Sequence, residues 1–107
     1  MYKRKASERL LQELIEAAID INTHIIVQTG NMAPDDYFES FIDAGRLNII
    51  SMEFAEKLAP SAGLRNRLVH EYDSLEHEMV LTFARMAQGL YPLYVKAIED
   101  YLTGSSK

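Results

Sequence analysis

Apolar residues recur at intervals of three and four over residues 6–29 of the chain. The positions that share this spacing are Leu10, Leu11, Leu14, Ile15, Ala18, Ile21 and Ile25. This period is typical of an amphipathic helix, and Glu13, Glu16 and Asp20 lie on its polar face. Gly30-Asn31 predicts the end of the helix, because glycine readily adopts the left-handed backbone that closes many helices.

A second helix is predicted after the turn at residues 32–36. Asp35 or Asp36 can cap it, since a carboxylate accepts hydrogen bonds from the free N–H groups of a first turn. Its apolar stripe, which we expect in the core, consists of Tyr37, Phe38, Phe41 and Ile42. We expect Gly45 to end this helix.

Ser51 is the candidate N-cap of a third helix. The apolar face of this helix consists of Phe54, Leu58, Leu64 and Leu68. Pro60 lies inside the pattern, and proline lacks an N–H donor and clashes with the preceding turn. We therefore expect the third helix to be distorted at Pro60, by a break or a kink.

A capping box of Asp73, Ser74 and Glu76 predicts the start of the last helix. Its helically spaced apolar residues are Val80, Leu81, Ala84, Ala87, Leu90, Tyr91, Tyr94, Ile98 and Tyr101. Pro92 should bend it. No strand pattern and no internal repeat is seen, so the sequence predicts an all-α fold, an up-and-down bundle of about four helices.

The composition supports a single small domain over residues 1–107, with frayed ends at 1–5 and 103–107. No cysteine is present, which excludes disulfides, thiolate catalysis and cysteine-bound zinc. The longest apolar run is residues 25–27, too short to cross a bilayer. The basic N-terminus leads into an amphipathic segment and not into the apolar core of a signal peptide. We expect a cytoplasmic protein without membrane attachment.

Charge is distributed unevenly along the chain, whose net charge is −5. Residues 1–9 carry net +3 and residues 46–70 carry net +2, whereas residues 10–45 carry net −7 and residues 71–107 carry net −3. An acidic protein with a local basic segment suits a small anionic target, or one that it engages only locally. It does not suit a protein that coats long nucleic acids.

The densest set of reactive side chains lies in the second basic segment, at Leu64-Arg65-Asn66-Arg67-Leu68-Val69-His70-Glu71-Tyr72-Asp73. Several familiar sites are excluded. His70-Glu71 lacks the second histidine of the HExxH zinc motif, because position 74 is serine. The glutamate–histidine spacing of di-iron bundles, a glycine-rich phosphate loop and a serine triad are also missing. We therefore expect neither a metal ion nor a cofactor.

Arg65 and His70 are the candidate catalytic residues. On an ideal helix, five residues place two side chains about 140° apart, so these two flank one face instead of stacking on it. Asn66 and His70 share a face, being four residues apart. A second copy across a twofold axis would double the set and close a cleft over a substrate.

The chemistry that these residue types support is cleavage of an RNA phosphodiester. Histidine titrates near working pH, so it can remove the proton of the attacking 2′-hydroxyl or protonate the leaving 5′-oxygen. Arginine offers a permanently charged fork to the phosphoryl oxygens, and no metal is required. From spacing alone, an ordinary surface arginine and histidine remains the favoured interpretation, because R-x-x-x-x-H is common by chance. His24 could be a ligand or a base, but a packed or surface histidine is favoured there.

The sequence of residues 64–72 favours the catalytic interpretation more strongly than the spacing alone does. It closely resembles the R-x-x-x-x-H-x-Y signature of HEPN-domain toxins. The most similar subgroup is the HepT toxins, which pair with a minimal nucleotidyltransferase antitoxin of the MntA type. The helix that ends in His24-Ile25-Ile26 and the segment from Pro34 to Tyr37 are also similar to that family. The resemblance covers about residues 5–102.

The resemblance implies a homodimeric, metal-independent endoribonuclease, the toxin of a type VII-like toxin–antitoxin pair. By position, Arg65 and His70 match the catalytic pair, Asn66 matches a supporting polar position, and Arg67 is a candidate RNA contact. Tyr72 matches the tyrosine that the antitoxin modifies with AMP. Such a group would put bulk and negative charge beside His70 and block an anionic substrate.

In one respect the chain departs from the family, whose members usually carry another helix before the one that begins here near Ala6. Part of the first helix's apolar face is then expected to be uncovered, or covered by a partner. Two alternatives stay open. One is a catalytically silent helical module that binds RNA, a nucleotide or another protein, and the other is a plain structural subunit.

Overall fold

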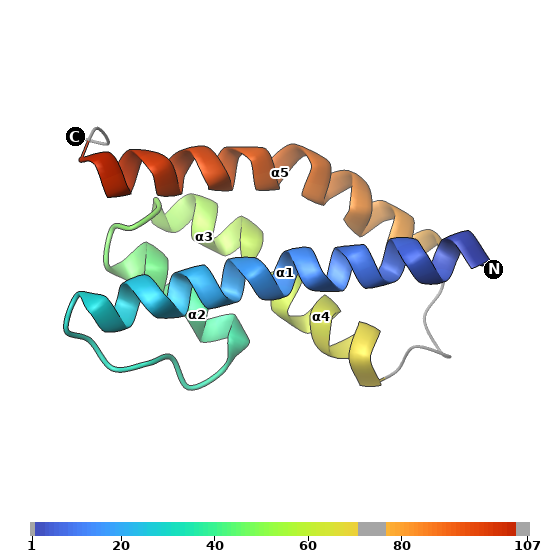
Figure 1. Cartoon of the computed structure of the whole chain (residues 1–107), viewed down its shortest axis with the longest axis horizontal. Coiled ribbons are helices and arrows are strands. Elements are labelled where there is room, and N and C mark those ends of the chain that lie inside the picture. Colours follow the sequence, from blue (N-terminus) through green and yellow to red (C-terminus); the bar gives the residue numbers. More distant parts are fainter. Residues whose placement is uncertain (1, 71–76, 105–107) are drawn as a thin grey trace.

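The computed structural model describes residues 2–70 and 77–104, and the residues described are helical apart from the links between helices. The helices are α1 (Tyr2–Gln28), α2 (Tyr37–Arg46), α3 (Met52–Leu58), α4 (Pro60–His70) and α5 (His77–Thr103). The predicted all-α bundle is confirmed (Figure 1). None of the described helices combines the length and the apolar character needed to cross a membrane.

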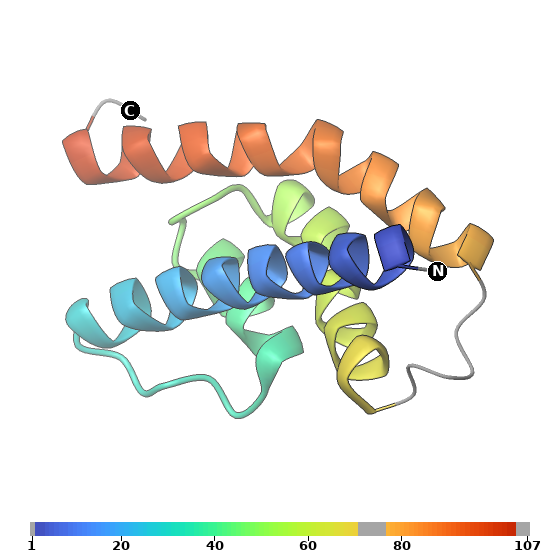
Figure 2. The same cartoon turned by 45° about the vertical axis from the view of Figure 1, so that its right-hand side comes forward.

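Two long helices frame the molecule, and three short ones lie beside them. α1 and α5 both run from right to left in Figure 1; in Figures 1 and 2 they approach each other at their N-terminal ends and separate toward the left, where α3 lies between them. α4 passes beneath α1 in both views. Because α4 carries most of the candidate site, its packing against α1 decides what the site can contact.

The core joins all five helices. Its largest fully buried apolar side chains are Ile15 and Ile26 of α1, Phe41 of α2, Leu58 of α3 and Tyr94 of α5. The Tyr94 hydroxyl donates a hydrogen bond of 2.5 Å to Oδ1 of the buried Asn22 and lies 3.1 Å from the carbonyl oxygen of Ala18. This polar contact inside the core fixes α5 against α1.

The helix ends show which local signals were predicted correctly. Asp36 is the N-cap of α2 and accepts a hydrogen bond from the backbone N–H of Glu39, and Ser51 caps α3 in the same way. Gly30 has a φ of +90°, and the N–H of Asn31 reaches the carbonyl of Ile26. This Schellman-type closure confirms the predicted end of α1.

Two predicted boundaries differ from the structure. α1 begins at Tyr2 and not near Ala6. Gly45 lies inside α2, which continues through Arg46. A Cβ at Gly45 would come within 2.7 Å of the Cβ of Ala55. Gly45 therefore serves the close packing of α2 on α3 and does not end its helix.

Pro60 acts as predicted, and Pro92 lies inside a continuous helix. α3 ends at Leu58 and α4 begins at Pro60, so the third helix is broken there into two segments. α5 continues through Pro92, where the missing N–H removes the bond to the carbonyl of Gln88, and its ribbon is curved in both views (Figures 1 and 2). The capping box at residues 73–76 lies outside the described residues.

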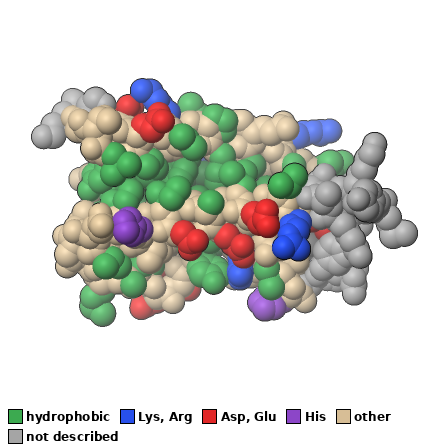
Figure 3. All heavy atoms as spheres, viewed as in Figure 1, with side chains coloured by type: hydrophobic (Ala, Val, Ile, Leu, Met, Phe, Trp, Pro, Cys, Tyr) green, Lys and Arg blue, Asp and Glu red, His purple; other side chains and the backbone are tan. Residues whose placement is uncertain are grey.

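Several apolar side chains that were predicted in the core are exposed. In α1, Leu10 is 67% exposed, Leu14 is 41% exposed, and both line a groove of about 590 Å³ against α5. Figure 3 shows hydrophobic side chains gathered in a band between these two helices. In α2, Phe41 is buried, but Tyr37 and Phe38 are 40% and 49% exposed. The core expectation for those two aromatics is therefore wrong, and Tyr37 contacts the site instead.

Candidate active site

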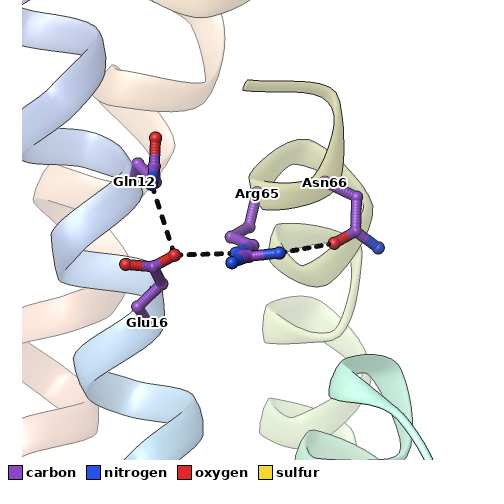
Figure 4. A network of polar contacts seen from close by, with 4 residues as sticks. All are labelled: Gln12, Glu16, Arg65 and Asn66. Atoms are coloured by element: carbon purple, nitrogen blue, oxygen red, sulfur yellow. Dashed lines mark hydrogen bonds and ion pairs between the residues drawn. The ribbon is translucent and has the colours of Figure 1, made fainter. Parts of the chain in front are cut away.

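α4 presents the candidate site because its apolar residues fix the rotation of the helix. Pro60 occupies the first position of α4, where the missing N–H costs no helical hydrogen bond. Leu64 and Leu68 are buried and hold one side of α4 against the core. With that side fixed, Arg65 extends toward α1 (Figure 4).

Arg65 is held by three neighbours. Its Nε donates a hydrogen bond of 2.8 Å to Oε2 of Glu16 on α1, and Nη1 donates one of 3.1 Å to Oδ1 of Asn66 (Figure 4). The same Glu16 oxygen accepts a bond of 3.3 Å from Nε2 of Gln12. The guanidinium carbon lies 4.7 Å from the centre of the Tyr37 ring, a distance typical of a cation–π contact.

These contacts leave part of the arginine fork available. A guanidinium carries five N–H groups, and the contacts with described residues use one on Nε and one on Nη1, which leaves three. A hollow of about 140 Å³ lies beside the group, between Ile19 and Asp20 of α1 and Tyr37 of α2. The site can therefore offer several charged N–H donors to an anionic oxygen.

His70 is exposed at the last position of α4. Within the described part of the chain, no hydrogen bond or ion pair joins it to Arg65. Asn66 is exposed as well and shares the helical face of His70, so it links that face to Arg65 through the Nη1 contact. The structure thus brings Arg65 and Asn66 together, and it places His70 apart from them as an exposed side chain.

The remaining two predicted site residues are Arg67 and Tyr72, and the structure describes the first of them. Arg67 is half-buried, and its Nη1 lies 3.0 Å from Sδ of Met79 on α5. This contact turns Arg67 partly toward its own chain. Tyr72 lies outside the described residues.

Sequence reasoning missed Glu16 and Tyr37 as parts of the site. Glu16 was placed on the solvent face of the first helix, and Tyr37 was placed in the core. Glu16 stands 49 residues from Arg65 in the chain, so no local spacing could reveal the pair. A carboxylate facing a neighbouring helix, and a tyrosine directly after an N-cap, are weak signals without a tertiary structure.

The all-α bundle is consistent with the HEPN-like class of helical domains. The comparisons specify the class further: the family model described as "Ribonuclease HepT-like" matches residues 1–98. The chain belongs to this HepT-like family.

Three curated relatives are similar to the chain. A tRNA nuclease HepT of Aphanizomenon flos-aquae is 47% identical over 96 residues, which are 90% of this chain and 65% of the relative. A putative RNase of Archaeoglobus fulgidus is 35% identical over 82% of this chain and 66% of the relative. An mRNA nuclease HepT of Shewanella oneidensis is 35% identical over 66% of this chain and 53% of the relative. The chain therefore spans no more than about two thirds of these relatives' length.

Proposed function

We propose that this protein is a metal-independent endoribonuclease and the toxin of a HEPN and minimal-nucleotidyltransferase pair. The observation that carries the proposal is Arg65, held on two sides with three N–H donors unused by the described residues, on the same helix as the exposed His70. Family membership supports the reaction class, and two of the relatives are named as a tRNA nuclease and an mRNA nuclease.

Arg65 binds the scissile phosphate in this mechanism. Its free N–H groups stabilise the negative charge that builds on the phosphoryl oxygens as the 2′-hydroxyl attacks. His70 takes the proton of that hydroxyl or gives one to the leaving 5′-oxygen. The products are a 2′,3′-cyclic phosphate and a 5′-hydroxyl. Asn66 supports the site by holding Nη1 of Arg65.

Two copies complete the site. Arg65 extends toward α1, whereas His70 lies exposed at the far end of α4. Arg65 and His70 are five residues apart on α4, so their Cα–Cβ bonds point about 140° away from each other around the helix axis. Facing copies of α4 would place the Arg65 of one protomer near the His70 of the other.

Regulation falls to Tyr72, which follows His70 by two residues. We propose that a nucleotidyltransferase antitoxin transfers AMP from ATP to the Tyr72 hydroxyl, with release of pyrophosphate. The added phosphate competes with RNA for Arg65. Intact mass after incubation with the antitoxin and ATP should rise by whole AMP units in the wild type and by fewer units in Tyr72→Phe. An equal rise in both would refute Tyr72 as the acceptor.

The reaction itself is tested with the purified, unmodified protein in the presence of EDTA. The substrate is an RNA whose cleavage position has been mapped, compared with the same RNA carrying a single 2′-deoxy sugar at that position. We expect cleavage of the first and none of the second at that bond. Binding of both without cleavage of either would favour the silent binding module instead.

A further inference from the structure

We propose that Glu16 and Tyr37 are positioning residues for Arg65, which fix the guanidinium so that its terminal N–H groups face the scissile phosphate. Neither residue touches the substrate in this view. Each acts through the arginine, and the proposal rests on the ribonuclease function given above.

Glu16 fixes one edge of the guanidinium. Its Oε2 accepts the Nε hydrogen bond of 2.8 Å, and the ion pair is largely shielded, since the Arg65 side chain is 18% exposed and that of Glu16 is 33% exposed. Gln12, one turn earlier on α1, donates to the same oxygen. The contact with Gln12 thus restrains the Glu16 carboxylate on α1, and the restrained carboxylate in turn fixes the position of the Arg65 Nε.

The Tyr37 ring lies against the guanidinium, whose carbon is over the ring. Its position is itself fixed, because Asp36 caps α2 directly before it. The ring lies 4.7 Å from the guanidinium carbon and is 40% exposed, so it contributes little to the core and much to this contact. A hydrogen bond at Nε and a ring against the guanidinium carbon together leave the group little freedom to move.

Glu16 is itself an anion beside Arg65, so the alternative to positioning is that Glu16 competes with the RNA phosphate for Arg65. A competing carboxylate is expected to grip the terminal nitrogens in a two-bond fork, as a phosphate does. Glu16 instead engages Nε, and the second bond, from Nη1, goes to the neutral amide of Asn66. The geometry therefore orients the arginine and leaves its outer N–H groups available.

The test compares four variants in RNA cleavage: Glu16→Ala, Glu16→Gln, Tyr37→Ala and Tyr37→Phe. We expect Glu16→Ala and Tyr37→Ala to lower kcat by about 10- to 100-fold, because a misplaced catalytic group costs rate at the chemical step. Glu16→Gln keeps an acceptor for Nε and Tyr37→Phe keeps the ring, so both should retain most of the activity. Glu13→Ala is the matched control, since Glu13 lies on the same helix and, among the described residues, pairs with the exposed Arg9 and not with Arg65.

Two results would overturn the proposal. If Glu16→Ala and Glu16→Gln both lower KM at unchanged kcat, Glu16 competes with the substrate. If the alanine variants lower only the free energy of unfolding, at unchanged kcat, the ion pair is merely structural. The Nε–H signal of Arg65 in NMR spectra should be sharp in the wild type and broadened in Glu16→Ala, and an unchanged signal would also contradict the proposal.

A failure of the proposed function would be visible separately. If the wild type does not cut RNA, the function is refuted, and positioning is then decided by the Arg65 signal and by binding of inorganic phosphate. Weaker phosphate binding by Glu16→Ala than by Glu13→Ala would support positioning without catalysis. Equal binding by the two variants would refute it.

Discussion

Tyr94 and Asn22 form the most deeply buried polar contact described in the core. A buried polar group is costly unless it is hydrogen-bonded, and the Tyr94 hydroxyl satisfies the side-chain oxygen of Asn22. Burial raises the pKa of Tyr94 well above its ordinary value of 10.0, and the neighbouring Tyr91 adds to the shift. The hydroxyl therefore stays protonated and able to donate over the whole working range of pH.

Tyr94→Phe should lower the free energy of unfolding by about 1–3 kcal/mol, because it leaves a buried acceptor without its donor. Urea denaturation measures this change. Tyr101→Phe is the control, since Tyr101 is partly buried on the same helix and its hydroxyl makes no hydrogen bond with the described residues. Equal losses in the two variants would show that the Asn22 contact contributes no stability.

The same hydroxyl predicts a loss of stability in alkali. The pKa of Tyr94 is raised in the folded protein, so above about pH 10 the unfolded chain releases the proton first and binds fewer protons than the native state. Stability is then complete below the unfolded pKa and falls as the pH rises beyond it. Urea denaturation at several alkaline pH values should show a shallower fall for Tyr94→Phe. Equal slopes would contradict the burial of this hydroxyl.

At the residue scale, short-range roles could be predicted and long-range ones could not. Ser51 was identified as a cap because its partner, the N–H of Phe54, lies three residues away. Tyr37 was assigned to the core from its spacing, yet its ring meets Arg65 on another helix. Spacing describes the face of a helix, but it does not say which neighbour covers that face.

Among the short elements, α2 and α3 depend on one glycine for their close approach. A Cβ at Gly45 would lie 2.7 Å from the Ala55 Cβ and 3.1 Å from the Met52 Cα. Both distances are shorter than ordinary contact between carbon atoms. Backbone atoms cannot move aside as a flexible side chain can, so the two helices would have to separate.

Gly45→Ala should therefore destabilise the protein by about 1–3 kcal/mol through overpacking. Gly89→Ala is the matched control, because Gly89 lies inside α5 with no atom within 4 Å of the new Cβ. There the change should stabilise the helix by about 0.5–1 kcal/mol. Thermal unfolding of both variants measures the difference, and a stabilised Gly45→Ala would contradict the tight contact.

Breaks between elements could be predicted because proline and glycine act on the backbone next to them. The division of the third helix at Pro60 is such a case. The buried side of α1 was predicted only in part, since Leu10 and Leu14 fit the helical spacing as well as Leu11 and Ile15 do. Which of these pairs faces the core depends on where α5 lies, and that is not encoded in α1.

At the scale of the whole molecule, the charge pattern and the position of the site agree. Arg65 belongs to a locally basic segment of an acidic chain, and it meets the carboxylate of Glu16 from the most acidic segment. The sequence predicted the helical class, which is confirmed, and it indicated the stretch that carries the candidate site. It could not predict that the arginine faces α1, because that direction follows from the packing of α4.

The two-copy site predicts that inactive variants complement each other. Arg65→Ala and His70→Ala should each be inactive alone, but a mixed dimer keeps one pair of Arg65 and His70 from different protomers. With random exchange of protomers, the mixture should recover about a quarter of the wild-type activity. Size-exclusion chromatography controls for dimer formation, and a mixture that stays inactive despite mixed dimers would place both residues of a site in one protomer.

The central claim is that His70 acts chemically on RNA at a site anchored by Arg65. The measurement that tests it most directly is the single-turnover cleavage rate of one RNA by the wild type and by His70→Ala. His24→Ala is the control, since His24 is also exposed but lies on α1. We predict a loss of about 100-fold or more in His70→Ala and no loss in His24→Ala. Equal rates for the wild type and His70→Ala would contradict the account.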